Sequence, residues 1–156
     1  MSGHVRSDPP LRVADHPFFQ GADPAFVERV GHHATEATWE AGEFLFHEGD
    51  PARSFYLLFH GKVALELGAP DRPKLTIQTV GPRDVLGWSW LVPPYRWRFD
   101  ARAVKATRAL VLDAEVLREA FEARPEDGYW FLLRLVPVIG ERLEMARLQI
   151  LDIYGV

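Results

Sequence analysis

Aromatic and basic side chains are concentrated in one segment, residues 86–101, with the sequence LGWSWLVPPYRWRFDA. The segment holds three of the five tryptophans of the chain, and Arg96 and Arg98 stand between its rings. Aromatic faces and guanidinium groups together can hold a flat or an anionic ligand. Pro93 and Pro94 fix φ and remove two backbone donors, which predicts a turn. The segment therefore either fills a core or lines a binding pocket.

The polar residues show no pattern typical of catalysis or metal binding. His47-Glu48 lacks the second histidine that a helical zinc motif requires. His47 and His60 could approach each other on adjacent strands, but the ligand spacing of barrel-type metal sites is absent. There is no glycine-rich phosphate loop, and Ser54 and Ser89 have no nucleophile motif around them. We predict that the chain is not an enzyme and has neither a metal site nor a cofactor.

The composition fits one globular domain of 156 residues that needs no disulfide, since cysteine is absent. The net charge of −4 argues against a dedicated nucleic-acid-binding protein, which is usually basic. The sequence contains no run of about eighteen apolar residues, so it predicts no membrane span, and the N-terminus has no apolar leader segment. We therefore expect a cytoplasmic protein.

The order of helix and strand patterns defines the predicted architecture. Residues 1–14 are predicted to be a disordered tail, and residues 15–156 a single domain that begins with a short helix after Asp23. From about residue 35 to 113, short runs with a period of two alternate with turn residues. This pattern predicts an α+β fold, with an antiparallel jelly roll of about eight strands between a short N-terminal helix and C-terminal helices.

The last forty residues have a helical pattern. One helix is predicted over about 114–124, and a second, long helix from Pro125 to about Tyr154, with a kink or break at Pro137 and Gly140. Apolar residues at spacings of three and four form a stripe on the long helix: Leu132, Leu135, Ile139, Leu143, Ala146 and Ile150. The stripe predicts a homodimer that pairs through this helix. The alternative is that the helix folds back on the sheet.

Over about residues 15–154, this order of elements resembles the cyclic nucleotide-binding domain of catabolite-activator-type (Crp/Fnr-like) bacterial regulators. Residues 43–50 (EFLFHEGD) are similar to the second strand and glycine turn of the family. Residues 55–63 (FYLLFHGKV) and 81–87 (GPRDVLG) are similar to the next strand pair and to the entry of the nucleotide-binding cassette. The resemblance implies a non-enzymatic regulatory or sensor domain with a small ligand inside the roll.

The family's cassette recognises its ligand through a glycine and a glutamate, then an arginine about ten residues later followed by small residues. Gly87 matches the glycine, whereas Trp88 occupies the glutamate position and Trp97 the arginine position. A shift of one residue would place Arg98 at the arginine position instead. The resemblance thus gives these candidate ligand-binding residues: Gly87, Trp88, Ser89, Trp97, Arg98, Phe99 and Asp100.

The two lost polar groups predict weak binding of cAMP and cGMP. Each loss costs on the order of 2–4 kcal/mol, and together they take a micromolar ligand beyond millimolar. Two interpretations of the tryptophans remain open. They plug the pocket, or they line it for a flatter or more apolar ligand, with Ser89 and the backbone after Gly87 available to an anion.

We therefore predict a homodimeric, cyclic nucleotide-binding-like sensor with altered or lost cAMP and cGMP binding. The alternative is a protein-interaction adaptor whose pocket is plugged by aromatic side chains. Regulators of this family carry a helix-turn-helix domain after the long helix. Because the sequence ends at Val156, we expect no DNA-binding domain. Because no apolar run is long enough to cross a membrane, we also expect no membrane contact.

Overall fold

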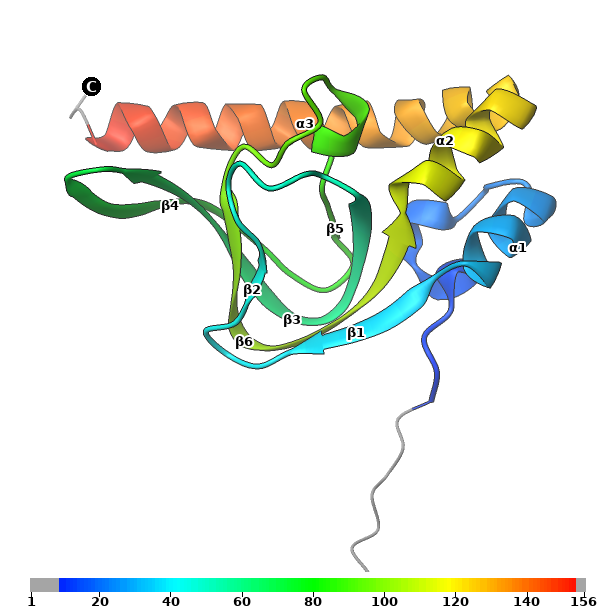
Figure 1. Cartoon of the computed structure of the whole chain (residues 1–156), viewed down its shortest axis with the longest axis horizontal. Coiled ribbons are helices and arrows are strands. Elements are labelled where there is room, and N and C mark those ends of the chain that lie inside the picture. Colours follow the sequence, from blue (N-terminus) through cyan, green and yellow to red (C-terminus); the bar gives the residue numbers. More distant parts are fainter. Residues whose placement is uncertain (1–8, 154–156) are drawn as a thin grey trace, which may run out of the picture.

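One antiparallel sheet of six strands curls into a roll, with the shorter helices at one end and the long C-terminal helix along one side (Figure 1). The computed structural model describes residues 9–153. In the sheet, β1, β6, β3 and β4 are neighbours in that order, while β2 pairs with β6 and β5 pairs with β3. The strands are β1 (Thr35–Trp39), β2 (Phe44–Phe46), β3 (Ser54–Ala69), β4 (Arg72–Val80), β5 (Val85–Leu86) and β6 (Asp100–Asp113). This arrangement confirms the predicted jelly-roll class.

The strand count is lower than the eight predicted, because two long strands each span a pair of expected short ones. Gly61 lies between two apolar runs of the sequence, as a turn residue would, but β3 continues through it with a register shift against β6. The φ of Gly61 is +100°, and a Cβ there would lie 2.5 Å from the carbonyl oxygen of Ala106. Glycine at this position therefore produces a bulge within a bent strand rather than a turn.

The N-terminal part of the described chain is folded onto the roll. It consists of two 3₁₀ turns, η1 (Val13–Asp15) and η2 (Pro17–Phe19), and the helix α1 (Pro24–His32). Asp23 caps α1 by accepting a hydrogen bond from the Ala25 N–H at 2.9 Å, as expected. The predicted tail over residues 1–14 is wrong at its end, because Val13 is a buried core residue. The rest of that prediction, residues 1–8, lies outside the described residues.

Two helices follow the roll, α2 (Ala114–Ala123) and α3 (Pro125–Ile153). Helix α3 runs along one side of the whole molecule without interruption (Figure 1). Of the predicted kink or break at Pro137, the break is therefore wrong. The turns on either side of Pro137 are tethered to the domain, since Arg134 donates to the Pro17 carbonyl at 2.7 Å and Arg142 donates to the Val85 carbonyl. These tertiary contacts hold the helix across a residue that weakens it locally.

Helix α3 presents one apolar face to the core and leaves a second one uncovered. Phe131 and Leu135 are buried, and Leu135 is only 1% exposed. Leu135 was predicted at the dimer interface, and this assignment is wrong because the side chain packs inside the domain. Ile139 and Ala146 are half-buried. The exposed apolar residues that follow a heptad spacing along α3 are Tyr129, Leu132, Val136, Leu143 and Ile150.

Within residues 9–153, no helix has the length and apolar content needed to cross a membrane.

Candidate functional site: a filled ligand cassette

The segment between β5 and β6 turns back on itself at its two prolines. Its only helical part is the 3₁₀ turn η3 (Ser89–Leu91), which follows Gly87. The Tyr95 N–H donates to the Val92 carbonyl at 2.8 Å across Pro93 and Pro94. The turn predicted from the prolines is confirmed. It carries the second half of the segment back toward Gly87.

The indole of Trp97 fills the space beside Gly87. Trp97 is 4% exposed, and its ring stacks on Phe46 of β2 with 3.7 Å between ring centroids and 10° between ring planes. A Cβ added to Gly87, whose φ is +103°, would lie 2.8 Å from the outer edge of the Trp97 ring. Only glycine allows the ring to approach the backbone so closely. The residue at the family's arginine position is therefore a packed core side chain.

Trp90 secures the same segment from the other side. It is fully buried, its Nε1–H donates to the Gly87 carbonyl at 2.8 Å, and its ring contacts Phe131 of α3 with centroids 5.8 Å apart. Arg118 of α2 donates to the Trp90 carbonyl at 2.7 Å. The segment is thereby connected to both C-terminal helices.

Arg98 lies on the outside of the segment. Its side chain is exposed, donates to the Pro93 carbonyl at 3.2 Å, and stands 5.6 Å over the ring of the half-buried Trp88. Neighbouring residues of an extended chain point to opposite sides. Trp97 therefore occupies the inner position, and the one-residue shift does not bring the Arg98 guanidinium into the roll.

Asp100 is a buried member of a polar cluster whose other side chains, Lys74 and His47, are partly exposed. Its carboxylate accepts hydrogen bonds from the Glu48 N–H at 2.7 Å and from Lys74 Nζ at 2.5 Å, and His47 Nδ1 lies at 3.8 Å. Burial alone would raise the pKa of Asp100, but the bonds from Lys74 and Glu48 outweigh it and lower that pKa. Asp100 thus ties β6 to the turn after β2. Phe99, also buried, packs against Phe46 with centroids 5.8 Å apart.

Ser89 has a buried hydroxyl that finds no hydrogen-bond partner among the described residues. Four cavities found among residues 9–153 have no lining contribution from Trp88, Ser89 or Trp97. The sequence did not identify Phe46 as part of this site. Phe46 lies in the alternating run over residues 43–47, and this alternation could have indicated that its side chain points inward.

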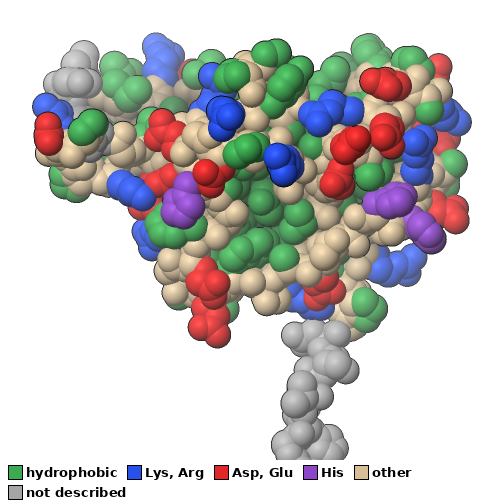
Figure 2. All heavy atoms as spheres, in the orientation of Figure 1, with side chains coloured by type: hydrophobic (Ala, Val, Ile, Leu, Met, Phe, Trp, Pro, Cys, Tyr) green, Lys and Arg blue, Asp and Glu red, His purple; other side chains and the backbone are tan. Residues whose placement is uncertain are grey.

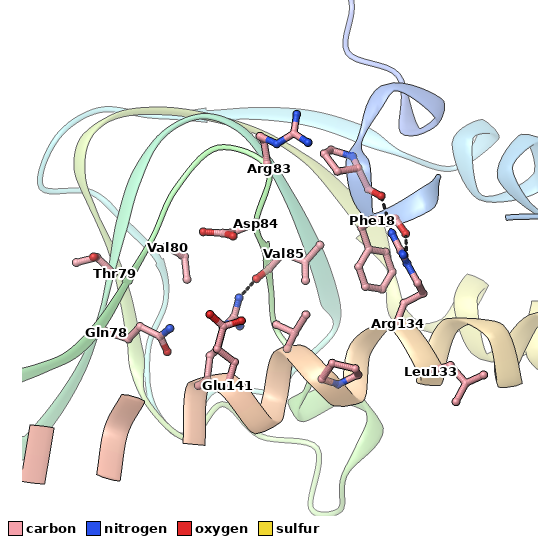
Figure 3. Close-up of a pocket in the computed structure, with 14 residues that line it drawn as sticks. Phe18, Gln78, Thr79, Val80, Arg83, Asp84, Val85, Leu133, Arg134 and Glu141 are labelled. Carbon is pink, nitrogen blue, oxygen red and sulfur yellow. Dashed lines mark hydrogen bonds between the residues drawn. The ribbon is translucent and has the colours of Figure 1, made fainter. Parts of the chain in front are cut away.

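A separate cavity of about 480 Å³ lies between α3 and the edge of the roll (Figure 3). Asp84 and Glu141 lie on opposite sides of it, and Arg142 also lines it. Burial lowers the pKa of Arg142 to about 10, an effect that Asp84 and Glu141 partly oppose. Arg142 stands seven residues after the buried Leu135, and this spacing puts it on the buried side of the helix.

No group of three His, Cys, Asp or Glu side chains between residues 9 and 153 lies close enough together to hold a metal ion.

The fold and the cassette place the molecule among jelly-roll domains that end in a long helix. The family model of the cyclic nucleotide-binding domain matches residues 36–124, which is more than half of the chain. The chain belongs to this family.

Known regulators are similar to this chain. A CRP-like cAMP-activated global transcriptional regulator of Mycobacterium tuberculosis is 26% identical over 135 residues, which is 86% of this chain and 58% of that protein. The cyclic AMP receptor protein of Thermus thermophilus is 27% identical over 130 residues, 81% of this chain and 53% of that protein. The chain thus spans little more than half the length of these relatives.

Solved structures show the same architecture. The N-terminal domain of a transcriptional regulator from Streptomyces coelicolor has a TM-score of 0.66 at 26% identity, covering 85% of this chain and 92% of that one. The catabolite activator protein of Thermus thermophilus has a TM-score of 0.68 at 25% identity, covering 89% of this chain and 63% of that one. The expectation that the chain belongs to this family is confirmed.

Proposed function

We propose that this chain is a non-enzymatic regulatory module of the cyclic nucleotide-binding family that has lost ordinary cAMP and cGMP binding. The observation that carries the proposal is Trp97, which stacks on Phe46 and abuts Gly87 where the family holds its ligand. In this interpretation, the protein's own side chains keep the cassette in one packed state. The module then acts through protein contacts, as an adaptor.

The energetics support a lost ligand rather than a retuned one. A cyclic nucleotide in the cassette must displace a buried tryptophan, and emptying such a core position costs about 3–5 kcal/mol. The ligand's ribose would then find no glutamate, because Trp88 stands at that position, and its phosphate would find no inward arginine, because Arg98 lies outside. A buried anion without a cation is strongly disfavoured. Both effects weaken the binding of a cyclic nucleotide.

The surface that such an adaptor would use is the uncovered stripe of α3. The predicted interface residues Leu132, Leu143 and Ile150 remain exposed there, and Leu143 is 71% exposed. Apolar residues at heptad spacing on an uncovered helix are typical of helix pairing. We propose a homodimer in which two copies of α3 pair along this stripe, with Ile139 and Ala146 at its edge.

Ligand sensing is the second candidate, and the cavity beside α3 favours it. The cavity has the volume of a small-ligand site and combines Arg142 with Gln78, Asp84 and Glu141. A ligand held there would contact the helix that carries the dimer stripe. A sensor of this kind would use α3 instead of the cassette.

Isothermal titration calorimetry of the purified chain with cAMP, cGMP and a cyclic dinucleotide tests the proposal. We expect no heat of binding for cAMP or cGMP in the micromolar range. Submicromolar binding of either one overturns the lost-cassette proposal. Binding of cAMP that is abolished by Arg142→Gln but retained in Arg147→Gln would establish the sensor at α3, because Arg147 lies on the same helix and pairs only with Glu144.

A further inference from the structure

Three arginines converge on a shallow hollow of about 590 Å³ on the outer side of the cassette segment. Arg53 comes from the loop before β3, Arg96 from the segment itself, and Arg118 from α2. The other lining residues are Pro51, Ala52, Pro94 and Tyr95. Figure 2 shows several Lys and Arg side chains over the upper part of one face of the molecule. The hollow is distinct from the cassette interior and from the cavity beside α3.

The positive charge of this hollow is not neutralised within the described chain. Among residues 9–153, none of the three arginines forms an ion pair. Arg96 donates to the Gly49 carbonyl and Arg118 to the Trp90 carbonyl, each at 2.7 Å. A guanidinium has five N–H donors, so most donors of the cluster face solvent. No Asp or Glu lines the hollow, although α2 carries acidic residues one turn away from Arg118.

Tyr95 provides an aromatic surface that is held in place at the edge of this cluster. Its φ is +57°, a backbone conformation that residues other than glycine rarely adopt. Its backbone is fixed on both sides, because its N–H donates to the Val92 carbonyl and its carbonyl accepts from the Ala52 N–H, each at 2.8 Å. The ring remains 46% exposed, with the Arg118 guanidinium 5.6 Å from its centroid. A strained residue that exposes an aromatic ring points to a functional constraint.

We propose that this hollow binds a phosphoryl group whose carrier molecule packs against the Tyr95 ring. Guanidinium groups match phosphate oxygens with paired hydrogen bonds. Three guanidinium groups offer more donors than the two oxygens of a carboxylate can accept, whereas a phosphoryl dianion has three oxygens and two negative charges. An aromatic base, an aromatic side chain or an apolar side chain can cover the exposed ring. The carrier is a free nucleotide or a phosphorylated peptide.

Calorimetric titration with inorganic pyrophosphate tests the anion site in the full chain. Arg53→Gln leaves every hydrogen bond described above intact, and we expect it to weaken pyrophosphate binding about tenfold, as the loss of one charge-assisted contact does. Arg72→Gln is the matched control, because Arg72 is exposed on β4, away from the hollow. We expect this control to bind like the unaltered chain. No pyrophosphate binding, or equal weakening by both variants, overturns the proposal.

Three further titrations identify the carrier, with AMP, with adenosine and with a short phosphotyrosine peptide. If AMP binds more tightly than pyrophosphate and adenosine does not bind, a free nucleotide is the carrier. If the peptide binds more tightly, the carrier is a partner protein. Tyr95→Ala should remove the advantage of the tighter ligand and leave pyrophosphate affinity unchanged. Loss of pyrophosphate binding in Tyr95→Ala, with Arg53→Gln unaffected, contradicts the assignment of roles.

Discussion

At the scale of single residues, Trp97 and Gly87 decide what the cassette can do. The two residues are in mutual contact, because the absence of a side chain at Gly87 makes room for the Trp97 ring. Gly87 therefore accommodates a side chain of the same protein. Asp100 is likewise engaged within the protein, since its carboxylate accepts hydrogen bonds from Lys74 and the Glu48 N–H.

Trp97→Ala should lower the free energy of unfolding by about 3–5 kcal/mol, because it removes a buried ring and leaves a cavity beside Phe46. Urea unfolding followed by circular dichroism measures this change. Trp88→Ala is the control, and its free energy of unfolding should fall clearly less, because Trp88 is only half-buried. Equal losses at the two positions would contradict the placement of Trp97 in the core.

The lowered pKa of Asp100 predicts an acid-dependent loss of stability. A carboxyl group whose pKa is lower in the folded state stabilises the fold above its unfolded pKa, and that contribution disappears as the pH falls through the folded pKa. Asp100→Asn should therefore destabilise the protein at about pH 7, and the difference from the unaltered chain should shrink below about pH 4. Urea midpoints over this pH range measure the effect. A difference that is constant with pH would show that the Asp100 charge is not involved.

At the scale of elements, the sequence predicted the three α-helices and the roll, but not all of the 3₁₀ turns, how the strands join or where α3 packs. Local patterns sufficed for the Asp23 cap and for the start of α3 at Pro125. Gly61 looked like a turn residue, because a bulge and a turn both require glycine at positive φ. The continuity of α3 through Pro137 depends on contacts with residues far away in the sequence, such as Pro17 and Val85.

Leu143→Glu tests the exposed stripe of α3. A charge in a helix seam is costly, so we expect this variant to be monomeric at concentrations where the unaltered chain is a dimer. Leu148→Glu is the matched control, since Leu148 is also exposed, at 51%, but lies on the other side of the helix. Sedimentation equilibrium measures both. If the unaltered chain is a monomer at tens of micromolar, the proposed dimer is wrong.

At the scale of the whole molecule, the cassette segment is connected to both C-terminal helices. Trp90 packs against Phe131 of α3, and Arg118 of α2 holds the Trp90 carbonyl. The arginine hollow lies on this junction, because Arg118 also lines it. An anion bound there would act on α2 and on the segment together, without entering the roll.

The candidate site was only partly predictable from the sequence. The resemblance located the cassette and the two missing polar groups, but it left open whether the tryptophans close the pocket or line it. That choice depends on Phe46, which lies about fifty residues before Trp97 in the chain and meets it only in the folded roll. Arg118 and Arg142 were missed for the same reason, since their contacts are with distant backbone carbonyls.

The central claim is that Trp97 stays in the cassette in the presence of nucleotide. Each of the five tryptophans gives one indole N–H resonance, and Trp97→Phe assigns that of Trp97. An NMR titration with cAMP up to millimolar concentration therefore reports directly on the ring. We expect the Trp97 resonance not to move. A saturable shift of this resonance at micromolar cAMP would show that the ring gives way to a ligand, and would contradict the account.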